Sequence, residues 1–328
     1  MGLPVTVYRW DDAGAPQLTA AKPSEIINVL KKCLVEGYGT KSALGWSVLF
    51  EDTGLRKIVL RNSPVTGSGG AFQLWSDGGA DLFSTPMRVK SAISISALDT
   101  FFKPSYQQAM SARTSSWNEW VLIGTSNAFY FIYGLTGGNT DAFGGIPQDN
   151  TIFVGDYDEF IPGDLNRFIA VINTNQTGNV TGSSFTLNDR FYYAFNTTSV
   201  AGCINLYGTQ GEDTAVNYGV NSIFTMTNLA SGIVFGNTKI GIYFPVLISL
   251  TLNPKSTLPN TLDLAGTPSI NSTVYPLFRG KFPGLIMAIS SNHRAVDWPV
   301  IDLHNGAQHM LMRSVGTQQC VWINMEEW

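Results

Sequence analysis

The chain has 328 residues, of which 44% are hydrophobic and only 13% carry a charge. This hydrophobic content can build a sizeable core and excludes an intrinsically disordered chain. The formal net charge of −4 gives no electrostatic basis for nucleic-acid binding. No apolar run reaches the roughly 18 residues of a membrane-spanning helix, so we expect no membrane insertion. The first residues lack a basic segment followed by an apolar one, and we expect no secretory signal.

The three cysteines are widely separated and form no CxxC pair. They are Cys33, Cys203 and Cys320. An odd number of distant cysteines is typical of reduced, buried thiols and not of a disulfide framework. This usage fits a protein that assembles in a reducing cytoplasm.

The chain opens with a strand pattern and then a helix pattern. Residues 3–10 alternate between two faces, as in a strand. Apolar residues at helical spacing then predict a helix over residues 24–36. Pro23 and Ser24 would form its N-cap, and Glu25 would lie in the first turn, where the helix dipole favours a carboxylate.

We expect Gly37 and Gly39 to end this helix in the left-handed conformation that glycine tolerates. The apolar stripe should pack into the core. The residues that we expect to be buried are Ile26, Leu30 and Cys33 or Leu34.

Strand patterns dominate the rest of the chain. Residues 46–50 and 57–60 form one expected hairpin, with Gly54 at the position of positive φ in its turn. Residues 120–124 and 128–133 form a second one. The pattern of residues 98–118 is ambiguous. The other expected strands are residues 71–75, 88–95, 151–154, 168–172, 239–244, 246–250 and 285–289.

These patterns predict a mainly β fold with two units. Residues 1–97 would form a small N-terminal α+β docking unit, a helix on an antiparallel sheet, and residues 98–328 a larger antiparallel β-rich structural domain. Three loops, residues 134–150, 173–184 and 253–273, hold too little apolar surface to pack on their own. We expect at least one of them to lie in an interface between subunits.

The histidines are the first residues to consider for chemistry. His293, His304 and His309 all lie in the last part of the chain, near Asp297 and Asp302. A metal or acid–base site would need these side chains to converge. The spacing of His304 and His309 does not fit one helix face, and no HExxH pattern is present. We therefore expect histidines without a catalytic or metal-binding role.

The densest acidic stretch comprises Asp156, Asp158 and Glu159. It could supply calcium ligands, or the paired carboxylates of a glycan hydrolase. An EF-hand loop needs glycine at its sixth position, where this chain has Ile161. A turn between strands is the simpler interpretation. Since no P-loop or nucleophile-elbow pattern is present either, the sequence predicts no enzyme and no catalytic, cofactor-binding or metal-binding residue.

The chain is rich in aromatic residues, with eight tryptophans and twelve tyrosines. Aromatic side chains on one exposed face would form a carbohydrate-binding module that contacts a host surface. Their positions inside expected strands favour a core or a subunit interface instead. The low charge also fits surfaces that pack against neighbouring subunits.

Several short blocks, spread over most of the chain, show similarity to a known group of proteins. They are residues 12–19, 33–39, 45–46, 120–123, 153–157, 279–285 and Trp328. In these blocks the chain resembles tailed-bacteriophage virion structural proteins of poorly defined role, which are encoded among head and tail genes. None of the blocks is a chemical motif, so the resemblance carries over no catalytic residue.

The resemblance implies a structural component of the virion that assembles in the host cytoplasm in several symmetric copies. Its partners would be other virion proteins and further copies of the chain. A tail or baseplate accessory protein is the first expectation, and a capsid decoration or head–tail neck protein is the alternative. A carbohydrate-binding module is the alternative from a different class.

Overall fold

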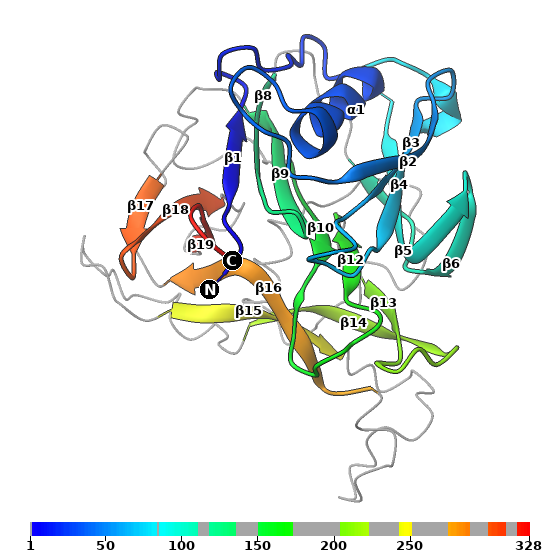
Figure 1. The fold of residues 1–328 in the computed structure, drawn as a ribbon, viewed down its shortest axis with the longest axis vertical. Helices are drawn as coiled ribbons and strands as arrows, with labels where there is room; N and C mark the ends of the chain where they lie inside the picture. Colours follow the sequence, from blue (N-terminus) through cyan, green and yellow to red (C-terminus); the bar gives the residue numbers. More distant parts are fainter. Residues whose placement is uncertain are drawn as a thin grey trace, which may run out of the picture.

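The computed structural model describes residues 2–83, 85–110, 118–135, 150–172, 204–222, 243–250, 275–288, 301–312 and 320–328. The fold is mainly β, with antiparallel sheets and a short helix near the N-terminus (Figure 1). The predicted fold class is therefore confirmed. The expected interface loops lie largely or wholly outside the described residues, as do Cys203, His293 and Asp297.

Three sheets make up the described structure. The central sheet runs in the order β1 (Thr6–Arg9), β8 (Glu119–Gly124), β9 (Ala128–Leu135), β10 (Asn150–Asp156), β12 (Phe168–Val171). The N-terminal sheet runs β2 (Ser47–Asp52), β3 (Lys57–Arg61), β4 (Ala71–Ser76), β5 (Met87–Ala97), β6 (Thr100–Pro104), with β7 (Gln108–Met110) also on β5. The C-terminal sheet runs β13 (Ile204–Tyr207), β14 (Ala215–Ser222), β15 (Tyr243–Leu250), β16 (Phe278–Ala288), β19 (Cys320–Asn324), β18 (Ala307–Met312), β17 (Ile301–His304), with β11 (Asp158–Glu159) on β16.

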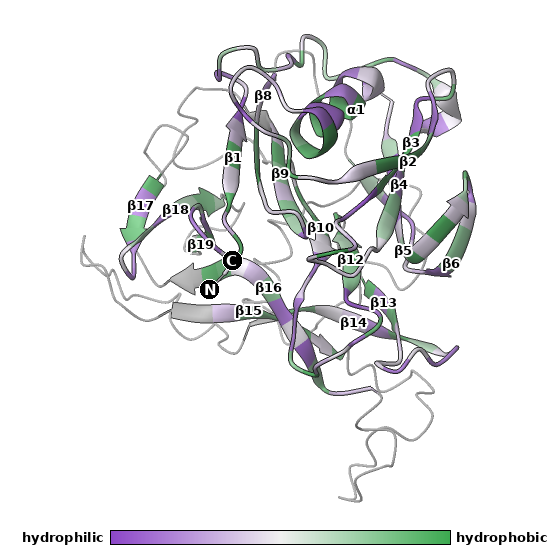
Figure 2. Ribbon diagram, viewed as in Figure 1, coloured by the Kyte–Doolittle hydropathy of each residue, from purple (hydrophilic) through white to green (hydrophobic). Residues whose placement is uncertain are grey.

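The central sheet separates two hydrophobic cores, because alternate side chains of its strands point to opposite faces. Val121, Ile123 and Tyr130 lie in the core shared with the C-terminal sheet. Leu122 and Phe131 lie in the core shared with the N-terminal sheet and the helix. Burial on both faces explains why these strands read as nearly continuous apolar runs. The hydrophobic stretches of β8, β9 and β10 are visible in the middle of the fold in Figure 2.

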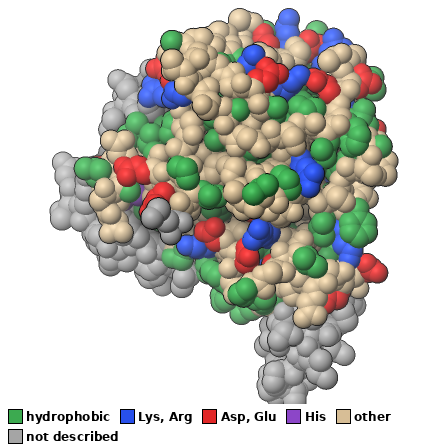
Figure 3. Space-filling view, viewed as in Figure 1, with side chains coloured by type: hydrophobic (Ala, Val, Ile, Leu, Met, Phe, Trp, Pro, Cys, Tyr) green, Lys and Arg blue, Asp and Glu red, His purple; other side chains and the backbone are tan. Residues whose placement is uncertain are grey.

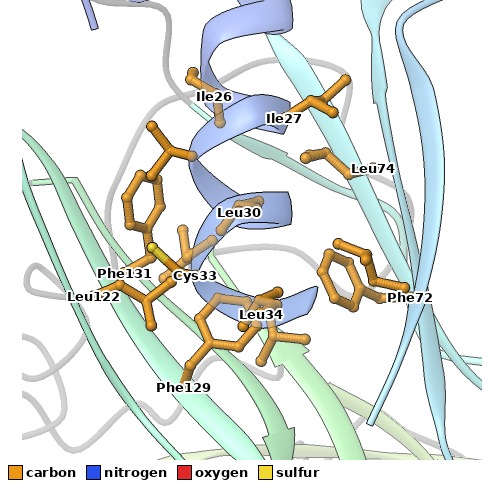
Figure 4. Packing of buried hydrophobic residues seen from close by; sticks show 14 of the residues in the cluster. Ile26, Ile27, Leu30, Cys33, Leu34, Phe72, Leu74, Leu122, Phe129 and Phe131 are labelled. Atoms are coloured by element: carbon orange, nitrogen blue, oxygen red, sulfur yellow. The ribbon is translucent and has the colours of Figure 1, made fainter. Parts of the chain in front are cut away.

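The helix fills the space between the N-terminal sheet and the central sheet. It comprises α1 (Pro23–Lys31) and a wider turn, η1 (Lys32–Glu36), in direct continuation. Leu30 is fully buried, and Ile26, Cys33 and Leu34 are buried beside it, as predicted. Figure 4 shows these side chains between Phe72 and Leu74 on one side and Leu122, Phe129 and Phe131 on the other.

The predicted N-cap was wrong by one to two residues. Lys22 is the N-cap and Pro23 is the first helical residue, which suits proline because this position needs no intrahelical N–H donor. The Glu25 carboxylate accepts a hydrogen bond from the Lys22 backbone N–H at 3.1 Å. Ser24 instead donates through its N–H and its hydroxyl to Asp81, at 2.9 and 2.8 Å.

Positive φ angles occur at the end of the helix and in the turn of the first hairpin. Gly37 and Gly39 have positive φ, as predicted for the helix end. In the β2–β3 turn the positive φ belongs to Arg56 (48°) and not to Gly54, so that prediction was wrong. Asp52 accepts the Leu55 N–H at 2.9 Å, and Arg56 bonds the Gly54 carbonyl. These bonds stabilise the turn around the arginine.

Strand pairing crosses the expected unit boundary at residue 97 in both directions. Strand β1 pairs with β8 in the central sheet, while β6 and β7 pair with β5 in the N-terminal sheet. The division into residues 1–97 and 98–328 stays a prediction. The ambiguous stretch of residues 98–118 contains β6 and β7, which the pattern did not resolve.

The outer edge of β12 is occupied by side chains from the N-terminal sheet. The Gln108 side-chain amide donates to the Ala170 carbonyl and accepts the Ile172 N–H, both at 2.7 Å. The Ser91 hydroxyl accepts the Ala170 N–H at 3.2 Å. Gln108 thus takes the place of a strand at this edge and joins the two sheets.

Candidate functional site

The β17–β18 hairpin brings together two of the histidines that the sequence placed five residues apart. Its turn consists of Asn305 and Gly306, both with positive φ, which is the requirement of a two-residue hairpin. Asp302 pairs with His309 across the hairpin, and His304 pairs with Ala307. The side chains of His304 and His309 therefore lie on one face of the sheet.

The two imidazole rings are neighbours inside the protein. Their centroids lie 5.5 Å apart at an interplanar angle of 83°, and the His304 ring lies 4.3 Å from that of Trp322 on β19. His304 is 2% exposed and His309 is 4% exposed. His309 Nδ1 lies 3.0 Å from the Ala307 carbonyl oxygen. Burial lowers the pKa of His309 below its ordinary value of 6.5.

Among the described residues, no metal centre forms around these histidines. Within the described part of the chain, no group of three or more histidine, cysteine, aspartate or glutamate side chains could hold a metal ion. The turn signal Asn305-Gly306 could have revealed this hairpin from the sequence, because Asn-Gly is a strong two-residue hairpin sequence. The strands expected from the sequence do not include this hairpin.

The three carboxylates of the acidic stretch contact polar and basic side chains, and Arg167 lies near both Asp156, at 3.5 Å, and Glu159. Asp156 is buried and accepts hydrogen bonds from the Ser68 N–H at 2.7 Å and the Ser68 hydroxyl at 2.5 Å. Burial raises the pKa of Asp156. Glu159 pairs with Arg167 at 2.8 Å, and Asp158 lies 3.6 Å from Lys281. The three carboxylates therefore act as structural contacts between strands and loops.

The loop between β3 and β4 is fixed on the end of β10, through Asp156, and on the turn between β8 and β9, through Asn127. Asn62 donates to the Asn127 carbonyl at 3.1 Å, and the Asn127 side chain donates to the Thr66 carbonyl at 2.8 Å. A side chain on Gly67 would meet Asn62, Asn127 and Asp156 within 3 Å. Hydrogen bonds therefore hold this loop in place, and a Cβ atom at position 67 would clash with the side chains beneath the loop.

A buried ion pair is the strongest polar feature that the sequence analysis missed. Both side chains of Asp164 and Arg279 are fully buried, and they are joined by two hydrogen bonds of 2.5 and 2.7 Å. The Tyr157 hydroxyl also donates to Asp164, at 2.6 Å, and Arg279 donates to the Tyr207 carbonyl at 2.7 Å. The pair ties the loop after β11 to β16 and β13. No local pattern marks two residues that are 115 positions apart.

Three residues close to this ion pair, along the chain or across the strand, have large exposed hydrophobic side chains. Phe160 donates its N–H to the Arg279 carbonyl at 3.0 Å and is 48% exposed. Leu165 follows Asp164 directly and is 60% exposed, and Leu277 lies two residues before Arg279 and is 41% exposed. We call Phe160, Leu165 and Leu277 the apolar rim. The face in Figure 3 carries hydrophobic side chains among uncharged surface and groups of positive and negative side chains.

The aromatic residues that could have formed a sugar-binding face lie mostly inside the described structure. Trp46, Trp120 and Trp322 are buried, and Trp10, Trp75 and Trp328 are partly buried. Trp46 packs edge-on against Phe72 and Phe129 in the core. The rings therefore contribute to packing and do not form an exposed platform in this part of the chain.

Comparisons with known proteins give no match: no protein-family model fits the chain, and no curated protein is similar to it in sequence. Among the described residues, no helix has the length and apolar character needed to cross a membrane.

Proposed function

We propose that this protein is a structural component of a tailed-phage virion, a tail or baseplate accessory protein that assembles in several symmetric copies. Its localisation would be the virion, and its partners would be other virion proteins and copies of itself. The proposal assigns it no enzymatic activity, cofactor or nucleic-acid partner. The short blocks of similarity described above first suggested this role.

The observation that carries the proposal is the apolar rim. Phe160, Leu165 and Leu277 are large hydrophobic side chains, each about half exposed, on residues close to the buried Asp164–Arg279 ion pair. Exposed hydrophobic side chains that gather in one place mark surfaces for protein contacts. The nearby charges of Glu159 and Arg167 neutralise each other. A partner surface therefore meets little uncompensated charge here.

A particle-incorporation experiment tests this role. Phage carrying Phe160→Ser with Leu165→Ser are compared with phage carrying Val65→Ser, a matched control because Val65 is exposed but lies on another loop. We expect the Val65→Ser protein in purified particles at wild-type level and the rim variant to be depleted, although it folds normally by circular dichroism. Electron microscopy of wild-type particles then gives the position.

Two outcomes would contradict the proposal. One is the absence of the wild-type protein from purified particles. The other is incorporation of the folded rim variant at wild-type level, which would remove the apolar rim as the basis of assembly. Density on the capsid or at the neck would keep the virion role and replace the tail or baseplate position.

A further inference from the structure

We propose that the β17–β18 hairpin is an acid-sensitive element, which loosens when the buried His309 takes up a proton. The first basis is geometric. His304 and His309 are almost fully buried, with ring centroids 5.5 Å apart, and the His304 ring lies against Trp322. An imidazolium ion at His309 would lose its hydration in such a site, beside a second buried ring.

Among the described residues, the charged groups that face His309 are Asp302 and Glu326. Strands β18 and β19 contain no charged residue. Asp302 lies opposite His309, and its carboxylate also accepts the Leu303 N–H at 2.8 Å. Glu326 raises the pKa of His309, and its carboxylate accepts the Gln308 N–H at 2.8 Å. Burial outweighs this attraction, so the pKa of His309 stays below 6.5.

The lowered pKa of His309 determines how the stability of the hairpin changes with pH. An opened hairpin binds a proton on His309 near pH 6.5, whereas the closed hairpin binds it only at lower pH. The closed form is therefore stable above about pH 6.5 and loses stability as the pH falls below that value.

The hairpin is placed to respond without unfolding the rest of the molecule. In the order of the C-terminal sheet β17 is the last strand, and its Ile301 and Leu303 are exposed. Strand β18 pairs with β19, and the residues after β19 bond to the start of the chain: Trp328 and Leu3 exchange two backbone hydrogen bonds of 2.6 and 3.1 Å. Loosening of the hairpin would therefore also affect the contact between the two chain ends, because β19 joins the hairpin to that contact.

Hydrogen exchange followed by mass spectrometry tests the proposal on the full chain. Exchange, corrected for its intrinsic pH dependence, is measured from pH 7.5 to pH 5.0 for wild type, for His304→Gln with His309→Gln, and for the control His293→Gln. We expect protection of residues 301–312 to fall at least ten-fold below pH 6.5 in wild type and in the control. Residues 119–135 should keep their protection, and the double variant should show no such fall.

Unchanged protection of residues 301–312 in wild type would overturn the proposal, as would an equal fall in the double variant. If the double variant does not fold, histidine NMR titration of wild type decides. A His309 ring that titrates below pH 6.5, together with broadening of β17–β18 amides, supports the proposal. A His309 ring that titrates at or above pH 6.5 overturns it.

Discussion

At the scale of single residues, Leu30 and Leu55 offer a comparison between a buried and an exposed leucine. Leu30 is fully buried between the helix and two sheets, while Leu55 is 50% exposed. We expect Leu30→Ala to lower the free energy of unfolding by about 2–5 kcal/mol, because the truncation leaves a cavity in a close-packed core. Leu55→Ala should change it by less than about 0.5 kcal/mol. Urea denaturation measures both, and equal effects would contradict the packing described for the helix.

Asp156 gives a prediction about pH. Its pKa in the folded protein is raised by burial above 3.8, so the folded state binds the proton more tightly than the unfolded chain. The stability that this group contributes is therefore greatest below about pH 3.8 and is lost as the pH rises through the folded pKa. Asp156→Asn does not titrate. Between pH 7 and about pH 4, wild type should gain stability relative to this variant.

Urea denaturation of wild type and Asp156→Asn at matched pH values provides the measurement. The comparison isolates Asp156, because the other titratable groups, including His309 with its opposite pH dependence, are present in both proteins. A difference in free energy of unfolding that stays constant, or moves in favour of the variant on acidification, would show that Asp156 is not desolvated as described.

At the scale of elements, the Asp164–Arg279 pair holds a loop, a strand and the apolar rim in place. Arg279→Met should cost about 3–5 kcal/mol, because it leaves the Asp164 carboxylate buried without its partner. Arg279→Met combined with Asp164→Leu should recover most of this loss, since no unpaired charge remains. Lys281→Met, at the half-exposed pair with Asp158, should cost at most about 1 kcal/mol.

Thermal and urea unfolding of these variants give the comparison. If Arg279→Met and Lys281→Met have equal effects, the buried pair does not stabilise the loop in the way that its burial implies. If the double variant is less stable than Arg279→Met alone, the loss comes from packing of the guanidinium and not from the unpaired carboxylate.

Elements with a strong local pattern could be predicted from the sequence. The hairpin of β8 and β9 follows directly from two apolar runs around a short polar turn. The helix follows from its apolar stripe and from the glycines after it. Strand β15 was expected as two runs, although pairing with β16 continues on both sides of Pro245. Local patterns find elements well, but they do not find their exact ends.

Contacts between distant residues could not be predicted in the same way. The bond of Ser24 to Asp81 and the ion pair of Asp164 with Arg279 join side chains that have no local relation. The neighbouring positions of His304 and His309 could have been foreseen, because Asn305-Gly306 is a hairpin turn. Helical spacing was the wrong test for residues on two paired strands.

At the scale of the whole molecule, the central sheet belongs to both cores. Val121 and Leu122 are adjacent in β8 but point into different cores. Loss of packing in either core therefore weakens the same strands. We expect one cooperative unfolding transition, with Leu30→Ala and Ile248→Ala lowering the same midpoint. Tryptophan fluorescence and far-UV circular dichroism should give coincident curves; two separate transitions would indicate two independently folding units.

The Gln108 bridge has a consequence for how the protein behaves at high concentration. A bare strand edge is a template on which other chains can add and grow into fibres. Gln108 and Ser91 already satisfy the outward N–H and carbonyl of Ala170, so β12 offers no such template. Uncontrolled polymerisation at this edge is therefore blocked even in concentrated solutions. Replacing Gln108 with leucine would expose the edge, and concentrated solutions should then become turbid on standing.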